Sequence, residues 1–381
     1  TLKSNERLLS LTLNTIAKDK QIEDGWRGFK RPVASRNLAN DVDDEVVDAL
    51  VASVNARNAD LTHRYYHLKA SWMGVKQLNW WDRNAPLPGD DDRQFSWDEA
   101  QHIVLDAFAG FDPKMAEIAA PFFNNNWIDA APRSGKSSGA FSHPVVPSVH
   151  PYILMNFAGK SRDVMTLAHE MGHGIHQSLA AAKGYLMSDT PLILAETASV
   201  FAEMLTFRHV LDSQKTAVSR RFLLAGKVED MLNTVVRQVA FHNFETEFHD
   251  RRFSGELTAD EISEIWIDTQ NAALGPAIKI GDDYRPIWSY VPHFVHTPFY
   301  VYAYAFGDCL VNALWQRYQV CVEEGQGASF IKQYTDLLMA GGTERYDVAL
   351  KRFDLDARQV TFWSLGLDMI GDMIDELESC S

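Results

Sequence analysis

Apolar residues recur at steps of three and four along most of the chain, the spacing that gathers them on one face of a helix. This pattern predicts helices over 41–75, 96–120, 163–183, 191–213, 217–250, 258–273, 298–324, 328–340 and 357–378. Thr258 with Glu261 matches a capping box, and Thr190 precedes Pro191, a residue favoured at the first helical position. The chain is therefore predicted to be mainly helical.

The region from about 121 to 160 breaks this pattern, because asparagine, glycine and proline recur too often for long helices. Within it, "HPYILMNFAG" (His150 to Gly159) is a short apolar run bounded by proline and glycine, which is typical of a strand. We expect a small β-sheet just before the helix predicted at 163–183. The chain has no internal repeat and no obvious linker.

Composition excludes several classes of protein. The 46% hydrophobic and 23% charged content of the 381 residues is that of a globular chain. A net charge of −15 argues against nucleic acid as a partner, and no run approaches the roughly 20 apolar residues of a membrane span. Three cysteines without metal-site spacing favour a reducing cytoplasm, and the acidic run 90–92 is expected to form a solvated loop.

The stretch "TLAHEMGHGIHQ" (166–177) carries the strongest chemical signal. His169 and His173 are one helical turn apart, so both imidazoles can reach one metal ion. Glu170 points about 100° around the helix, where it could take a proton from a metal-bound water. Gly172 and Gly174 are unfavourable inside a helix and indicate a close approach by a neighbouring backbone. The pattern is the His-Glu-x-x-His arrangement of zinc peptidases.

A catalytic zinc takes three protein ligands, so a third is required. The helix predicted at 191–213 offers Glu196 and Glu203, seven residues apart on one otherwise apolar stripe. Glu196 is the favoured ligand, whereas Glu203 could orient a ligating imidazole, bind the ion or lie on the surface. His176 is a ligand, an orienting group or a packing residue. With one zinc per chain, Glu170 would act as general base and then general acid in peptide hydrolysis.

A second cluster lies in "WSYVPHFVHTPFYVYAYAFG" (288–307). Imidazole and phenol donors are what a tetrahedral oxyanion beside a metal requires. Buried packing is an equally good reading of any one of these tyrosines. The candidates are His293, His296, Tyr300, Tyr302 and Tyr304.

Taken in order, "HPYILMNFAG…DVMTLAHEMGHGIHQ", "LILAETASVFAEML" and "PHFVHTPFYVYAYAFG" resemble the thimet-oligopeptidase-like zinc metallopeptidases, and most closely the oligoendopeptidase F group. The resemblance implies a mainly α, zincin-like fold with a deep substrate channel and a small β-sheet beside the motif helix. It implies that 1–120 is a helical region contributing to the channel wall and that 121–381 is the catalytic core. The family's N-terminal helical region is expected to be absent.

Residue by residue, the resemblance assigns the zinc ligands to His169, His173 and Glu196, and the catalytic base to Glu170. It further implies substrate and oxyanion contacts, with catalytic roles for His293, Tyr300 and Tyr302 and binding roles for His296 and Tyr304. Val295 stands where a tyrosine is expected. The strand from Tyr152 to Phe157 would pair with the substrate backbone, with Gly139 nearby.

These observations favour a zinc oligoendopeptidase that cleaves short peptides. Two other hypotheses remain open at the level of sequence. One is a non-catalytic, zinc-containing peptide-binding module or an inactive catalytic fragment, and the other is a helical scaffold whose histidines bind no metal.

Overall fold

The computed structural model describes residues 1–89 and 93–380, so the acidic run 90–92 lies outside the described residues. The chain is mainly helical with two small sheets, which confirms the predicted fold class. Along the described ranges, no helix is both long enough and apolar enough to cross a membrane.

The chain folds into two compact units, each assembled from separate stretches of sequence. Unit 1 comprises Thr1–Asp90, Ala225–Cys309 and Arg358–Ser379, and unit 2 comprises Asp91–Leu224, Leu310–Ala357 and Cys380–Ser381. Two helices, α9 (Ala217–Thr234) and α13 (Tyr302–Glu323), belong in part to each unit. Each unit is described separately below.

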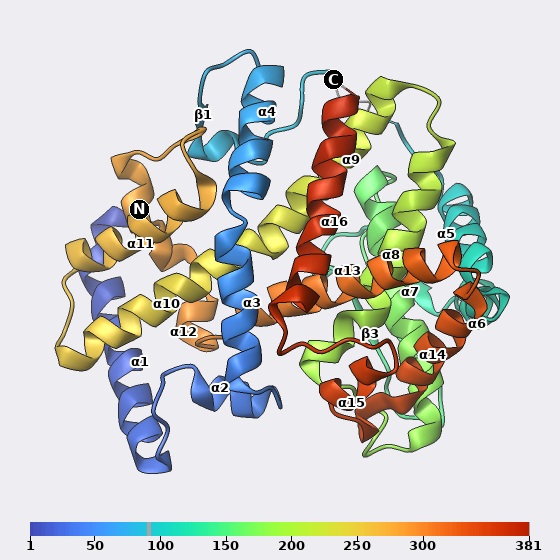
Figure 1. The fold of residues 1–381 in the computed structure, drawn as a ribbon, viewed down its shortest axis with the longest axis horizontal. Coiled ribbons are helices and arrows are strands. Elements are labelled where there is room, and N and C mark those ends of the chain that lie inside the picture. The colour runs from blue at the N-terminus through green and yellow to red at the C-terminus, as the bar shows by residue number, and fades with distance from the viewer. Residues whose placement is uncertain (90–92, 381) are drawn as a thin grey trace. The chain divides into compact units, whose positions relative to one another are not determined.

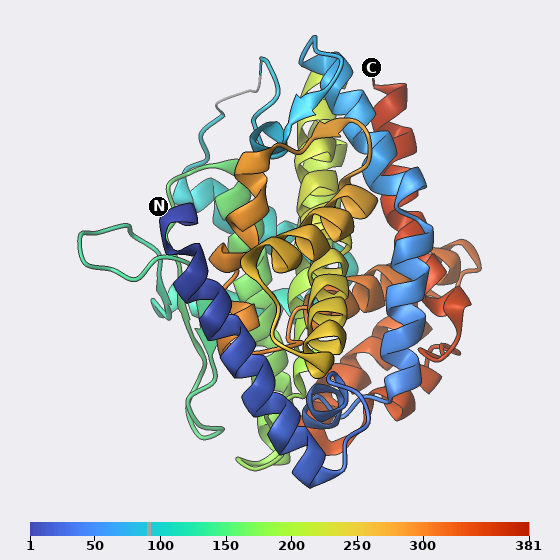
Figure 2. The same ribbon diagram turned by 90° about the vertical axis from the view of Figure 1, so that its left-hand side faces the viewer.

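Unit 1 is built around an aromatic core in which Trp266, Tyr284 and Trp288 are almost completely buried. The neighbouring helices α10 and α11 pack side by side (Figures 1 and 2). Its elements are η1 (Lys3–Asn5), α1 (Glu6–Arg27), α2 (Ala34–Ala39), α3 (Asp44–Ala56), η2 (Ala59–His63), α4 (Arg64–Trp72), β1 (Leu78–Asn79), η3 (Trp80–Asp82), α10 (Val236–Ser254), α11 (Ala259–Leu274), β5 (Ile278–Lys279), η5 (Asp282–Tyr290), α12 (His293–His296) and α16 (Val360–Ser379).

The structure contains a helix, α1, that apolar periodicity did not predict. Its charged residues interrupt the apolar stripe, and only a few of its side chains, among them Leu13 and Ala17, are buried. Asn14 instead fixes the helix through two hydrogen bonds with the backbone of Leu257, each about 3 Å long. Such a long-range polar contact leaves no periodic signal in the sequence. β1 and β5 form a parallel pair that was likewise not predicted.

Unit 2 combines helices with a three-stranded sheet. The strand order is β2-β4-β3, with β2 parallel and β3 antiparallel to β4. Both β3 and β4 pack against α7, so the small sheet lies beside the motif helix as predicted. Its elements are α5 (Trp97–Phe111), α6 (Pro113–Asn124), β2 (Ile128–Asp129), β3 (Phe141–His143), β4 (Tyr152–Leu154), α7 (Ser161–Ala180), η4 (Ala181–Lys183), α8 (Leu192–Ser213), α14 (Gly327–Ala340), η6 (Gly341–Thr343) and α15 (Tyr346–Lys351).

Three predicted helices are interrupted. The segment 96–120 divides at Asp112, whose carboxylate caps α6 by accepting the Lys114 N–H at 3.0 Å while Pro113 begins the new helix. Likewise 217–250 divides at Val235 into α9 and α10, and 41–75 divides into α3, η2 and α4. Apolar residues continue at helical spacing through each break, so periodicity alone does not show where one helix ends and the next begins. The capping box of Thr258 and Glu261 is confirmed.

Candidate metal centre

Helices α7 and α8 pack closely along their length in unit 2, and Gly172 explains why they can. A Cβ atom at Gly172 would lie 2.5 Å from the carbonyl oxygen of Ala198 and 2.7 Å from Cα of Ser199, both in α8. Only glycine therefore permits this approach. At Gly174 a Cβ would meet the ring of Phe122 at 2.8 Å. Gly172 thus provides the close backbone approach that the sequence indicated, whereas Gly174 makes room for an aromatic side chain.

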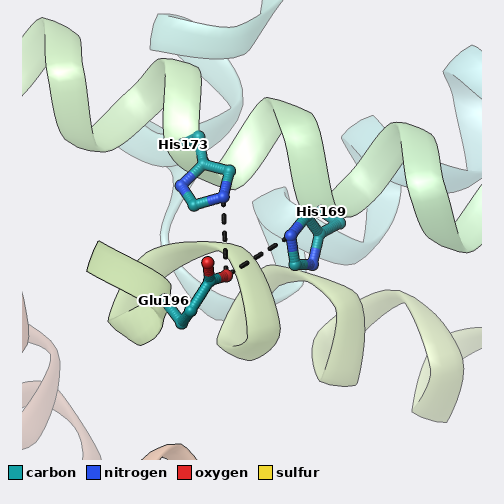
Figure 3. Close-up of side chains that lie close together, drawn as sticks. All are labelled: His169, His173 and Glu196. Atoms are coloured by element: carbon teal, nitrogen blue, oxygen red, sulfur yellow. Dashed lines mark ion pairs between the residues drawn. The ribbon is translucent and has the colours of Figure 1, made fainter. Parts of the chain in front are cut away.

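The close packing brings His169 and His173 of α7 to Glu196 of α8 (Figure 3). Oε2 of Glu196 lies 3.4 Å from Nε2 of His169 and 3.5 Å from Nε2 of His173. One donor atom from each of the three side chains lies within 4.8 Å of the others. Two atoms that are each about 2.0–2.1 Å from one tetrahedral zinc are roughly 3.4 Å apart. The geometry and the donor set therefore fit a zinc ion.

Glu203 lies seven residues after Glu196 in α8, about two helical turns further along, and contacts the other nitrogen of His169. Its Oε2 is 3.4 Å from Nδ1, while Nε2 of the same ring faces Glu196. Burial acts to lower the pKa of His169, but the contact with Glu203 and the charge of Glu196 outweigh it and raise the pKa to about 8. A carboxylate in this position fixes the ring orientation and directs Nε2 towards the ion site. Of the three roles open for Glu203, this geometry favours the orienting one.

Glu170 is almost completely buried, with 6% of its surface exposed, and its Oε2 has no hydrogen-bond partner among the described residues. Burial raises its pKa to about 7, assisted by the charge of Glu196 and opposed by His169 and by a hydrogen bond with the backbone of Ser142. A carboxylate with an unused oxygen beside three metal-binding groups is equipped to exchange a proton with a water molecule. Because His169, His173 and Glu196 supply the three ligand atoms, Glu170 is not needed as a metal ligand.

His176 takes no part in this arrangement. Its Nε2 lies 3.2 Å from Oγ1 of Thr190, and the ring hydrogen-bonds with the backbone of Ala195. Burial lowers its pKa to about 4. These contacts attach the end of α7 to the start of α8, so the geometry favours a packing role.

The small sheet differs from the predicted substrate platform in one respect. Tyr152 begins β4, which is the central strand and is already paired on both sides. The prediction that this strand pairs with substrate is therefore wrong for residues 152–154, because no backbone edge is available there. The edge next to α7 is β3 (Phe141–His143). The side chain of Tyr152 is nevertheless 48% exposed, and the carbonyl of Gly139 accepts a hydrogen bond from Asn156 at 3.2 Å.

The histidine and tyrosine candidates of 288–307 lie in unit 1 and separate into two groups. Nε2 of His293 is 3.1 Å from the hydroxyl of Tyr304, and the His293 ring stacks on Tyr300 with centroids 5.6 Å apart. His296 is exposed on the same short helix, α12. Tyr302 is instead completely buried, and its hydroxyl accepts a hydrogen bond from Asn40 at 2.9 Å. The predicted catalytic role of Tyr302 does not fit, because its hydroxyl faces the protein interior.

Glu245 of α10 is a residue that sequence reasoning missed. It is fully buried, and Oε1 accepts the backbone N–H of Phe299 at 2.7 Å. Phe299 has a left-handed backbone with φ of 60°, which is uncommon for a residue with a large side chain. The bond therefore holds the turn that precedes Tyr300. The sequence did contain a signal for Glu245. It stands at helical spacing between His242 and His249, so three ionisable residues share an otherwise apolar helix face.

Comparison with known proteins gives consistent matches. The sequence profile described as Peptidase family M3 matches residues 2–369. Oligopeptidase PepF of Bacillus subtilis (strain 168) is 28% identical over 372 residues, which cover 97% of this chain and 54% of PepF. The oligoendopeptidase F homolog of Lactococcus lactis subsp. lactis (strain IL1403) is 25% identical over 369 residues, which cover 96% of this chain and 60% of the homolog. This chain thus spans little more than half the length of these relatives.

Solved structures show the same fold. A Chlamydophila abortus protein aligns with a TM-score of 0.88 and 23% identity, covering 100% of this chain and 63% of that protein. The crystal structure of oligoendopeptidase-F from Enterococcus faecium aligns with a TM-score of 0.76 and 21% identity, covering 100% of this chain and 61% of that chain. At these identities the likeness is one of fold.

Proposed function

Because the chain belongs to Peptidase family M3, we propose that it is a zinc-dependent oligoendopeptidase that hydrolyses peptide bonds in short oligopeptides. The observation that carries the proposal is the convergence of His169, His173 and Glu196 at separations that suit one tetrahedral ion. Two imidazoles and one carboxylate leave a coordination position open, as catalytic rather than structural zinc sites do.

In this proposal the three side chains hold zinc, and Glu203 fixes the orientation of His169. When bound, zinc acts as a Lewis acid that polarises the scissile carbonyl and lowers the pKa of a water molecule. Glu203 contributes by keeping Nδ1 engaged, so that Nε2 remains directed towards Glu196 and the ion. The hydrogen bond from Ser199 Oγ to Oε2 of Glu196 restrains the third ligand.

Glu170 carries the proton in the proposed reaction. Its buried carboxylate accepts a proton from the attacking water and returns it to the departing amine, which would otherwise leave as an unstable anion. The unused Oε2 supports this assignment, because an atom already committed to a structural hydrogen bond would be less able to exchange a proton. Among the acids at this site, Glu170 is the one without a proposed ligand or orienting role.

We assign substrate contacts to His293, Tyr300 and Tyr304 in unit 1. The His293–Tyr304 hydrogen bond leaves a phenol and an imidazole as paired, partly exposed donors, which suits an oxyanion or a peptide carbonyl.

A second candidate function follows from the length of the chain. The chain spans 54% and 60% of the two relatives named above, and in the second candidate function it binds zinc and peptides without cleaving the peptides. Zinc stoichiometry and mass-spectrometric mapping of products from a mixed peptide library distinguish the two. We expect about one zinc per chain and internal cleavage of short peptides that a chelator abolishes. Peptide binding without products in the zinc-loaded protein would favour the second candidate, and a chain that binds no zinc would contradict both.

A further inference from the structure

Two arginines of unit 1, Arg83 and Arg237, lie on segments that hydrogen bonds hold together: the residues after η3 and the junction of α9 with α10. Nζ of Lys69 donates to the carbonyl of Arg83 at 2.8 Å, and Nδ2 of Asn233 donates to Oδ1 of Asn84 at 3.2 Å. Asn233 lies four residues before Arg237, on the other side of the break between α9 and α10. Burial and the charge of Arg83 together lower the pKa of Arg237 to about 10, as expected of two neighbouring cations.

Both guanidinium groups have donors that no acceptor uses. Arg83 is only 8% exposed, and its Nε and Nη1 are buried without a hydrogen-bond partner in the described part of the chain. The same holds for Nε of Arg237. A buried charged donor without an acceptor is destabilising, because it has lost its hydration and gained nothing in return.

The neighbouring acids are engaged elsewhere. Glu229 accepts hydrogen bonds from the completely buried Lys69 and from the hydroxyl of Tyr65. Asp82 accepts from the backbone and side chain of Asn79, and so caps η3. Neither carboxylate forms an ion pair or hydrogen bond with the guanidinium group of Arg83 or Arg237, so both positive charges lack an acidic partner among the described residues, in a chain whose net charge is −15.

A phenol completes the cluster. Tyr66 of α4 is 3% exposed; burial raises its pKa, and Arg83 and Arg237 both act to lower it. Tyr66 is therefore close to both cations. Two planar guanidinium groups and a hydroxyl donor are the groups that bind oxyanions in proteins, and the planar fork of arginine matches a carboxylate in two-point contact.

We propose that Arg83, Arg237 and Tyr66 form a binding site for a carboxylate. The bound group would accept the unused guanidinium hydrogens and neutralise the excess charge. It has two possible sources, a free small carboxylate or the carboxylate of a peptide, and the chemistry of the site is the same for both. All of these residues lie in unit 1, so the proposal does not rest on the metal centre or on peptide hydrolysis.

Isothermal titration calorimetry on the full chain tests the proposal. The probes are sodium acetate, an acetylated tripeptide with a free carboxylate, and the same tripeptide as its amide. The peptides are titrated into E170Q so that they stay intact. We expect saturable binding at one site per chain, weakened at least about tenfold by R83Q or R237Q, because each removes a two-point contact. The matched control is R64Q, since Arg64 is already paired with Glu378 and Asp375.

The outcomes separate the two sources. Acid peptide that binds at least about tenfold tighter than acetate, with no binding of the amide, identifies a peptide carboxylate. Equal affinities of acetate and acid peptide identify a free carboxylate. No saturable binding, or binding unchanged in the R83Q/R237Q double variant, overturns the proposal. Should a glutamine variant fail to fold, R237M provides the second measurement. We expect R237M to raise the melting temperature in acetate-free buffer and to abolish the upward shift that acetate causes in wild type.

Discussion

The metal centre of unit 2 and the His293–Tyr304 cluster of unit 1 are constructed differently. The metal centre takes every group from two consecutive helices, so spacing within each helix determines which side chains face the ion. The His293–Tyr304 cluster depends on a turn held by distant residues. Glu245 binds Phe299, and Arg36 Nε donates to the carbonyl of Pro298 at 3.3 Å. A helical site is thus specified locally, whereas a loop site needs anchors elsewhere in the chain.

The largest expected effect is on the helical site. Glu170→Gln removes the proton acceptor while preserving size and the surrounding contacts. We expect peptide cleavage to fall by at least about a hundredfold, the lower end of the range for general acid–base catalysis. Zinc content, measured by elemental analysis, should not change. Full turnover in zinc-loaded E170Q would exclude Glu170 as the general base.

The next effect tests whether helix packing really sets the metal centre. Gly172→Ala would place Cβ 2.5 Å from the Ala198 carbonyl and push α7 away from α8. We expect a stability loss of about 1–3 kcal/mol and weaker zinc binding, because overpacking forces the backbone to shift. Denaturant unfolding and competitive zinc titration provide the measurements.

Gly226→Ala is the matched control, since Gly226 lies within helix α9 and its added Cβ meets nothing within 4 Å. Alanine there should stabilise the protein by up to about 1 kcal/mol. If both variants behave alike, close approach at Gly172 is not what forms the site.

Glu245, which holds the turn at Phe299, should make the stability of the protein depend on pH. Burial raises the pKa of Glu245 to about 8 from an ordinary value of 4.5, against the opposing charges of Arg36 and Lys20. The folded protein therefore retains a proton that the unfolded chain loses. The stabilisation from this proton is complete below pH 4.5, falls as the pH rises and is lost above a pH of about 8.

Glu245→Gln keeps an acceptor for the Phe299 N–H but removes the titration. Relative to wild type, we expect the free energy of unfolding of E245Q to rise by several kcal/mol between a pH of about 5 and about 8, since each pKa unit corresponds to about 1.4 kcal/mol. Urea unfolding at three pH values measures the slope. Glu247→Gln, an exposed position on the same helix, is the control. Equal slopes for E245Q and wild type would show that Glu245 is ionised in the fold.

The smallest expected effects distinguish the roles of Tyr304 and Tyr302. Tyr304→Phe removes the hydroxyl that contacts His293, and we expect kcat to fall by about tenfold if that pair stabilises the reacting carbonyl. Tyr302→Phe removes the bond from Asn40 and should cost about 1 kcal/mol of stability with kcat unchanged. Steady-state kinetics and thermal unfolding of both variants give the comparison. A lower kcat in Y302F alone would restore the assignment made from sequence.

Sequence patterns were informative wherever contacts are local. The helical class, the strand before α7 and the capping box at Thr258 follow from periodicity and neighbouring residues. Asp112–Pro113 carries a cap signal, yet the continuous apolar period hides the break between α5 and α6. Helix α1 gave little periodic signal, because long-range hydrogen bonds from Asn14 hold it in place.

By itself, the sequence determined that His169 and His173 share a helix face, that Glu170 lies beside them, and that the following helix offers Glu196 and Glu203. These conclusions need only the helical repeat. The tertiary structure decided that Glu203 faces Nδ1 of His169, because that depends on how closely α7 and α8 pack.

It also decided that Tyr302 points inward and that Glu245 anchors the turn at Phe299. Those contacts join residues far apart in the chain, and their positions are set by packing rather than by the conformation of any one segment. No local period encodes such contacts.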